Sequence, residues 1–330
     1  DDGGVHRRSN NGSGWSSRNA NLGLCQFYAG LSTHSSDDER MYGGLQDNGT
    51  VRRTTTGTNW SSILGGDGGW TQVLQPTPTT VFAEYQGTGN LYKATDGGSN
   101  FDFAGSGINT SDRNCFLPPY LIDPANGSRM FYGTQRVWRS TNGGSSWSAL
   151  SGDLSAGSGA IRSLAISPAD GNVLWAATND GRVLVSTNGG ANFTLRLSGI
   201  PGWPRVTREL FPHLTSASTA WLAVASFSAN QVRRTTDSGL TWSALDQDLP
   251  EVPVNTIAAL PGPLDQLFAG TDRGVYYSPD GGQSWLRYGK NLPNVPVIDL
   301  LLQPERNRIV VATQGRGAWS ISLDILARRL

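Results

Sequence analysis

Three acidic residues, Asp47, Asp67 and Glu84, are the best candidates for chemistry in the sequence, and each lies close to glycines or amides that favour turns. Two carboxylates that face one cleft could act as acid and base on a glycosidic bond, and their separation would select the stereochemistry. Asp47 and Asp67 could equally bind Ca²⁺ through oxygen ligands. A plainer interpretation is that Asp-Asn-Gly and Asp-Gly-Gly are simply turns. All three interpretations stay open at this point.

A wider group of polar residues could bind a ligand without catalysing a reaction. It combines amides beside the acids with arginines spread along the chain, namely Gln46, Asp47, Asn48, Asp67, Gln86, Arg136, Arg208, Arg273 and Arg316. The three histidines, His6, His34 and His213, share no spacing typical of metal ligands. Zinc chemistry and Ser-His-Asp catalysis are therefore not expected, and no cofactor is predicted apart from the Ca²⁺ ion considered above.

Composition narrows the class of partner. The net charge is zero and no basic block is present, which argues against nucleic acid. No apolar run approaches the ~20 residues that a membrane helix requires. The expected partner is a glycan or a protein, and the chain could be a subunit of a larger assembly.

An eight-residue box repeats along the whole chain and predicts how these residues are positioned. Its fifth place is always glycine, and its eighth is always aromatic: Trp15, Trp60, Phe101, Trp147, Phe193, Trp242 and Trp285. Successive aromatics lie 45, 41, 46, 46, 49 and 43 residues apart. A fixed period of this size is the mark of a repeat architecture.

The third place of the box holds Asp96, Asp237 and Asp280 in three copies, and Asn142 and Asn188 in two others. Asparagine replaces aspartate well as an acceptor of backbone N–H groups but poorly as a catalytic acid. The mixture therefore indicates a structural role, with the box as a turn between two strands. Trp147, Trp242 and Trp285 are predicted to pack between repeats.

Each repeat contains four strands, which we call A to D. Strands A and B flank a turn that contains proline, and strands C and D flank the box. Four short antiparallel strands per repeat predict an all-β fold, a seven-bladed β-propeller over residues 1–330, with six or eight blades as alternatives. We expect the ring to close by pairing of residues 4–18 with residues 297–323.

The box resembles the Asp-box or BNR repeat, Ser-x-Asp-x-Gly-x-x-Trp, best at 278–285, 140–147, 186–193 and 235–242. Asp-box propellers include sialidases, xyloglucan-cleaving hydrolases, sortilin-type receptors and a photosystem assembly factor. In such families the box lies on the face opposite the ligand site, which propellers build from B–C and D–A loops. We expect Asp47, Glu84, Arg136, Arg273 and Arg316 in B–C loops, and Asp67 and Arg208 in D–A loops. Residues 42–50 and 64–69 also resemble the GG-x-QDNGT…GGDGG signature of secreted bacterial proteins described as glycosyl-hydrolase-like BNR repeats. The resemblance implies a secreted, periplasmic or cell-surface protein.

These observations leave three functional hypotheses. The first is an interaction scaffold that binds a glycan or a protein on the channel-mouth face. The second is a carbohydrate-active enzyme, a glycoside hydrolase or polysaccharide lyase that uses Asp47, Asp67 and Glu84. The third is an assembly factor or accessory subunit of a larger complex.

Overall fold

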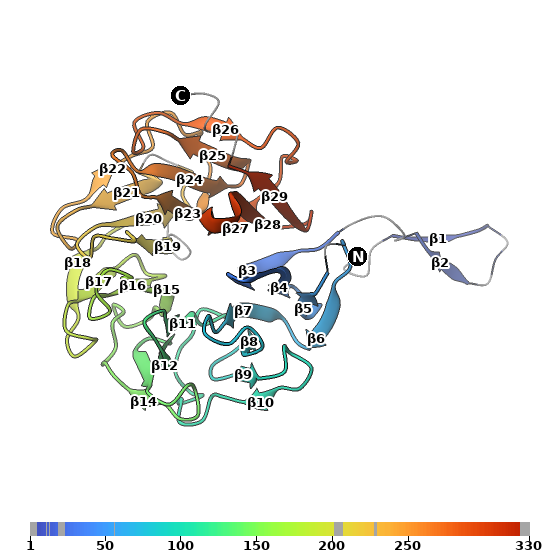
Figure 1. Cartoon of the computed structure of the whole chain (residues 1–330), viewed down its shortest axis with the longest axis horizontal. Coiled ribbons are helices and arrows are strands. Elements are labelled where there is room, and N and C mark those ends of the chain that lie inside the picture. The colour runs from blue at the N-terminus through green and yellow to red at the C-terminus, as the bar shows by residue number, and fades with distance from the viewer. Residues whose placement is uncertain are drawn as a thin grey trace.

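The computed structural model of the chain describes residues 5–10, 12, 14–18, 24–55, 57–200, 207–227 and 230–323. Seven antiparallel sheets of three or four strands stand around a central channel, which Figure 1 views along its axis. The fold is a seven-bladed β-propeller, as the repeat predicts, and the six- and eight-bladed alternatives are wrong.

The strands of each blade follow one another in sequence from the channel outward, in the order A to D (Figure 1). Blades I to III are β3 (Phe27–His34), β4 (Asp37–Leu45), β5 (Gly49–Arg53), β6 (Ser61–Leu64); β7 (Gly68–Val73), β8 (Val81–Tyr85), β9 (Leu91–Ala94), β10 (Asp102–Phe103); and β11 (Tyr120–Asp123), β12 (Asn126–Gly133), β13 (Val137–Ser140), β14 (Ser148–Ala149). Blades IV and V are β15 (Ile161–Ile166), β16 (Leu174–Thr178), β17 (Val183–Ser186), β18 (Thr194–Leu197); and β19 (Thr207–Pro212), β20 (Ala220–Val224), β21 (Val232–Thr235), β22 (Ser243–Ala244). Blade VI is β23 (Val254–Leu260), β24 (Gln266–Thr271), β25 (Gly274–Ser278), β26 (Leu286–Tyr288), and blade VII is β27 (Val297–Gln303), the 3₁₀ turn η1 (Pro304–Arg306), β28 (Arg308–Thr313) and β29 (Ala318–Ser322).

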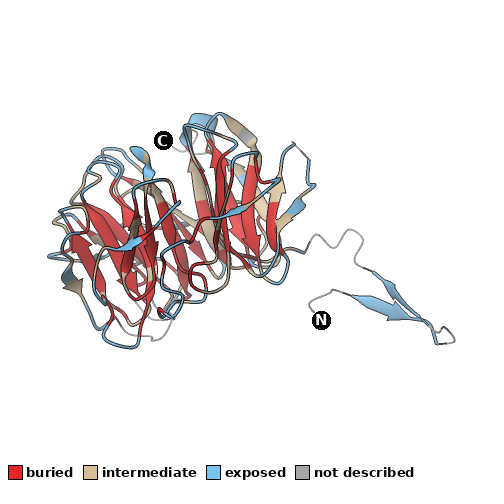
Figure 2. Ribbon diagram, turned by 90° about the horizontal axis from the view of Figure 1, so that it is seen from below, coloured by how far each residue is buried: buried red, intermediate tan, exposed pale blue. Residues whose placement is uncertain are grey.

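The core lies between blades rather than within them. The middle strands are buried on both faces, and β16 and β20 are buried along their whole length (Figure 2). One cluster joins Trp175 and Val185 of blade IV to Leu210 and Leu222 of blade V. Strands covered on both faces must carry continuous apolar runs, which explains the Leu-Trp-Ala-Ala and Ala-Trp-Leu-Ala-Val sequences of these two strands.

The third residue of the box accepts hydrogen bonds from the turn that follows it. Oδ1 of Asp280 accepts the backbone N–H of Ser284 at 2.9 Å, and Oδ1 of Asn142 accepts that of Ser146 at 3.0 Å. The first residue of the box also contributes, since Oγ of Ser278 accepts the N–H of Gly282 at 2.7 Å. Aspartate and asparagine thus accept the same hydrogen bonds in the turn, and this role requires an acceptor oxygen but no titratable group.

These turns place six of the seven box aromatics, all except Trp15, in apolar clusters with the preceding blade. Nε1–H of Trp147 donates to the Ala104 carbonyl at 2.7 Å, and Nε1–H of Trp285 donates to the Leu245 carbonyl, also at 2.7 Å. Both carbonyls belong to the residue three places after the previous box aromatic. The residue seven places after the previous box aromatic also belongs to the apolar cluster of the next one: Ile108 lies in the cluster of Trp147, and Leu249 lies in that of Trp285.

Ring closure differs from the sequence-based expectation. Residues 5–18 do not pair with residues 297–323 within the described part of the chain. Instead β1 (His6–Arg8) pairs with β2 (Trp15–Ser17) as a separate hairpin that stands away from the ring (Figure 1). The box between the two strands brings them together locally, across a short loop with a small entropic cost of closure. Among the described residues, blade VII therefore has three strands and no strand D.

Replacing Asp96, Asp237 and Asp280 together by Asn should reduce the acid sensitivity of the fold. Side-chain and backbone hydrogen bonds from Asn100 lower the pKa of Asp96 to about 2, and those from Thr241 lower the pKa of Asp237 to about 2. A carboxyl with a lowered pKa stabilises the folded state above its unfolded pKa of about 3.9 and loses that contribution as the pH falls toward about 2.

The urea midpoint of the triple variant should therefore fall less than that of the wild type between about pH 4 and pH 2, since Asn does not titrate. An equal fall in both proteins would contradict this account of the boxes.

Candidate functional site at the channel mouth

The B–C and D–A loops meet on one face of the ring, which we call the channel-mouth face, while the boxes turn at the opposite ends of the strands. The loops are hydrogen-bonded to one another. Gln86 N–H donates to the Asp67 carbonyl at 3.2 Å, Gly87 N–H donates to the Phe116 carbonyl at 2.9 Å, and Leu154 N–H donates to the Gln135 carbonyl at 2.8 Å. This mutual bonding makes the face a fixed surface on which side chains can be held in place.

The predicted group around Asp47 and Asp67 is brought together, but the carboxylate of Asp67 is engaged by the backbone. Oδ1 of Asp67 accepts the N–H of Asp47 at 2.6 Å, and the N–H of Asp67 donates to Oε1 of Gln86 at 2.8 Å. Gln46 bonds Gln26 through its side chain and receives Nδ2–H of Asn48 on its carbonyl at 2.9 Å. Asp47 itself has a φ of 59°, in the left-handed region that turns require.

We expected Glu84 in a loop, but it lies within strand β8 and has no exposed surface. Oε1 accepts the N–H of Trp70 at 3.3 Å, and Oε2 is buried without a hydrogen-bond partner among the described residues. Burial raises the pKa of Glu84 well above its ordinary value and favours the neutral acid. A side chain so enclosed cannot contact a substrate on the face.

The four predicted arginines do not share one environment. Arg136, Arg273 and Arg316 lie in B–C loops of blades III, VI and VII, and the last two are exposed. Arg136 pairs with the buried carboxylate of Asp112 through Nε at 3.2 Å. Arg208 belongs to strand β19 rather than to a D–A loop, and its side chain lies outside the described part of the structure.

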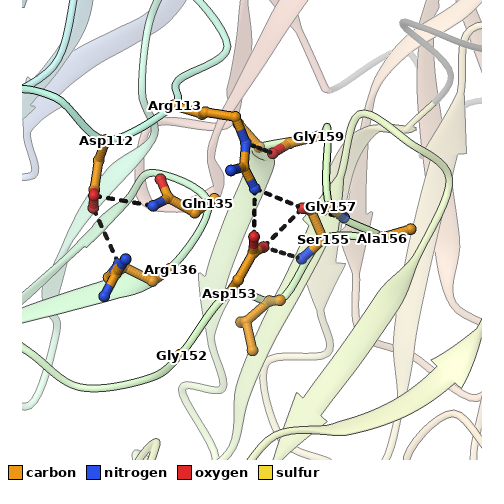
Figure 3. Close-up of polar contacts among 12 residues, drawn as sticks. Asp112, Arg113, Gln135, Arg136, Gly152, Asp153, Ser155, Ala156, Gly157 and Gly159 are labelled. Carbon is orange, nitrogen blue, oxygen red and sulfur yellow. Dashed lines mark hydrogen bonds and ion pairs between the residues drawn. The ribbon is translucent and has the colours of Figure 1, made fainter.

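Three charged residues that lay outside the predicted site, Asp112, Arg113 and Asp153, form two separate contacts near Arg136 (Figure 3). Asp112, whose side chain is only 3% exposed, accepts hydrogen bonds from Thr134 Oγ1 at 2.9 Å, Gln135 Nε2 at 3.0 Å and Trp138 Nε1 at 3.0 Å. Arg113 points the other way and forms an exposed ion pair with Asp153. Asp112 thus stabilises the fold by accepting these hydrogen bonds, while the charged side chains of Arg113 and Asp153 are exposed to solvent.

An aromatic pair completes this side of the face. Phe116, in the loop before β11, packs edge-on against Tyr28 of β3 with ring centroids 5.9 Å apart. Phe116 has a φ of 77° and remains 47% exposed, and its N–H donates to Oδ1 of Asn114 at 2.7 Å. The sequence around Phe116 gives little sign of this conformation, because only Asn114, two residues earlier, indicates a turn and no pattern predicts a left-handed phenylalanine.

The channel wall carries two further carboxylates, Glu209 and Asp299, which border a cavity of about 350 Å³. Oε2 of Glu209 accepts the N–H of Ile257 at 3.0 Å, and Oδ2 of Asp299 accepts the N–H of Leu31 at 2.7 Å. Burial raises the pKa of Glu209 to about 8, with a further rise from Asp299, and burial raises the pKa of Asp299 to about 6. Each carboxylate links the inner strands of two neighbouring blades.

Within the described ranges, no cluster of three or more His, Cys, Asp or Glu side chains could hold a metal ion. In the same part of the chain, no helix is long and apolar enough to cross a membrane.

No protein-family model and no curated protein matches the chain. Solved structures share its fold. The GH74 xyloglucanase from Xanthomonas campestris aligns with a TM-score of 0.69 and 16% identity, over 89% of this chain and 52% of that one. YCF48 from Cyanidioschyzon merolae aligns with a TM-score of 0.67 and 13% identity, over 89% of this chain and 94% of that one. YCF48 bound to D1 peptide aligns with a TM-score of 0.66 and 15% identity, over 91% and 94%.

These likenesses define the class of protein, a seven-bladed β-propeller of the kind seen in both GH74 enzymes and YCF48. The chain spans about half the length of the GH74 structures and nearly the whole length of YCF48.

The two acids of Figure 3 should differ sharply in their effect on stability. Asp112→Ala leaves Arg136 and three donors without their shared acceptor, and should lower the free energy of unfolding by about 3–5 kcal/mol. Asp153→Ala removes an ion pair whose side chains are 42% and 36% exposed, and should cost only about 0–1 kcal/mol. Urea denaturation of both variants measures the difference, and equal losses would contradict the roles assigned here.

Proposed function

We propose that this chain is a non-catalytic binding module that holds an extended protein segment on the channel-mouth face above blades I to III. The observation that carries the proposal is Phe116. A non-glycine residue at positive φ costs roughly 1–3 kcal/mol, and the side chain of Phe116 offsets this only in part, since it is 47% exposed and packs against Tyr28 alone among the described aromatic rings. Backbone strain at a residue that leaves much of an apolar side chain in solvent is typical of a binding site.

The surroundings of Phe116 suit a peptide. Tyr28 extends the apolar contact, while the Arg113–Asp153 pair and the exposed Asn48 supply polar groups for main-chain and charged partners. Interfaces that combine an aromatic anchor with a polar rim are typical of protein recognition. Further support comes from the YCF48 structure, since that propeller is bound to D1 peptide and its length matches that of this chain.

Glycan binding is the second candidate, because an exposed aromatic ring beside amides also suits the face of a sugar. The likeness to GH74 enzymes favours this class of ligand. Hydrolysis by Asp47, Asp67 and Glu84 is less well supported, since Asp67 is bonded to the turn and Glu84 is buried. As part of the proposal, we place the protein outside the cytoplasm, as the resemblance of its signature implies.

Phe116→Gly is the sharpest test of this site. Glycine adopts positive φ without strain, so the variant should keep or raise the melting temperature while losing the aromatic ring. Binding to a peptide array and a glycan array should then weaken at least about tenfold, the loss of ~1.4 kcal/mol or more expected for an aromatic anchor. Phe103→Gly is the matched control, because Phe103 is 57% exposed on the outer strand β10.

Preserved binding by Phe116→Gly would overturn the proposed site. If the protein prefers glycans to peptides, the proposed binding site stands but its ligand is a glycan. Polysaccharide hydrolysis that is lost in Asp67→Asn would instead establish the enzymatic alternative.

A further inference from the structure

A groove of about 860 Å³ borders the outer edge of blade VII. Leu286, Tyr288 and Leu292 line it from blade VI and the loop that follows, and Trp319 and Ile321 line it from β29. The groove therefore lies where strand D would stand in a complete blade. No residue of β29 is fully buried, whereas the C strands of blades III to VI all contain buried residues.

The groove also lacks the side chain that fills its counterparts. In neighbouring blades, the residues three and seven places after one box aromatic surround the next aromatic: Ala104 and Ile108 with Trp147, Leu150 and Leu154 with Phe193, and Leu245 and Leu249 with Trp285. The residues at these two places after Trp285 are Tyr288 and Leu292. Their cluster contains no box aromatic among the described residues.

One box aromatic is left over. Trp15, at the start of β2, is 68% exposed, and every residue of strands β1 and β2 is exposed. Trp15 precedes the first residue of β3 by 12 positions, and Trp242 and Trp285 precede the first residues of β23 and β27 by the same 12 positions. By its place in the sequence, β2 is the D strand of the blade that comes before blade I.

The residues directly before β3 already lie where this position of β2 would require them. The Cys25 carbonyl accepts N–H groups from Gly315 at 3.1 Å and Gly317 at 3.2 Å, both in the B–C loop of blade VII. Val252 stands ten residues after Trp242, as Cys25 does after Trp15, and its carbonyl accepts Nε2–H of Gln231 next to β21 of blade V. The connection to blade I therefore begins over the chain's own blade VII.

We propose that the blade VII groove is a docking site for β2 of the same chain, which adds to β29 as the fourth strand and seats Trp15 between blades VI and VII. In the docked state, β2 pairs with β29 instead of β1. The Nε1–H of Trp15 then donates a hydrogen bond to the Tyr288 carbonyl, as the Nε1–H of Trp285 does to the Leu245 carbonyl. The blade VII groove is thus a strand site rather than a substrate pocket. Open edge strands and exposed apolar grooves are both avoided in stable monomers.

The register follows from blade VI. Tyr277 pairs with Phe268, the third residue of β24, and with Leu286, the residue after Trp285. In blade VII, Ser320 pairs with Val310, the third residue of β28. Ser16 follows Trp15 and should therefore lie opposite Ser320. Residues directly opposite in an antiparallel pair have Cα atoms about 4.5–5.5 Å apart, within the range for a disulfide.

The test is oxidation of the full chain carrying Ser16→Cys and Ser320→Cys, with each single variant as control. Both serines are exposed, so neither substitution threatens the core. Peptide mapping should find a bridge between positions 16 and 320 in a species that remains monomeric on a non-reducing gel. A covalent dimer would overturn the proposal in favour of exchange between two copies, and free thiols at both positions would overturn docking altogether.

A second measurement does not depend on cysteine chemistry. Trp15→Ala should lower the melting temperature by several degrees, in the same range as Trp285→Ala, if Trp15 is docked. An unchanged melting temperature for Trp15→Ala, together with a clear fall for Trp285→Ala, would show that the tryptophan stays in solvent and would overturn the proposal.

Discussion

The ring depends on one interaction, the packing of box aromatics against the strand that leaves the preceding blade. Trp147 and Trp285 fill these seams and donate their indole N–H groups to carbonyls across them. A single blade exposes apolar surface on both faces, so it gains little stability alone. The hydrogen bonds of the boxes matter because they set the direction from which each aromatic enters the seam.

The same constraint explains why so few polar side chains remain available for chemistry. Strands packed around a channel leave backbone groups of the inner edges without ladder partners, and buried N–H groups must find acceptors. Asp299 and Glu209 supply acceptors along the channel, Asp67 supplies one at the mouth, and Asp112 gathers three side-chain donors below it. Asp67 and Glu84, which look catalytic in the sequence, likewise accept hydrogen bonds from backbone N–H groups. The groups that remain available for binding are the exposed Phe116 and the Arg113–Asp153 pair.

Much of the fold could be predicted, and the candidate site could be predicted only in part. The strand pairs around each box follow from local hairpin chemistry, and Asp47, Asp67 and Arg136 lie in the loops expected for them. Glu84 does not, because β8 continues to Tyr85 and is buried on both faces as far as Glu84. Phe116 gave almost no signal, since only Asn114 indicates a turn there and the hydrogen bond from Gly87 to the Phe116 carbonyl joins loops distant in sequence.

The sequence by itself determined the number and phase of the blades, because the box aromatic recurs at a nearly constant interval and each turn forms among residues close in the chain. Only the tertiary structure decided which acids are free, which arginines are paired and where the ring stays open. These outcomes depend on contacts between loops and strands of different blades, whose approach is set by packing around the whole ring and not by any local pattern.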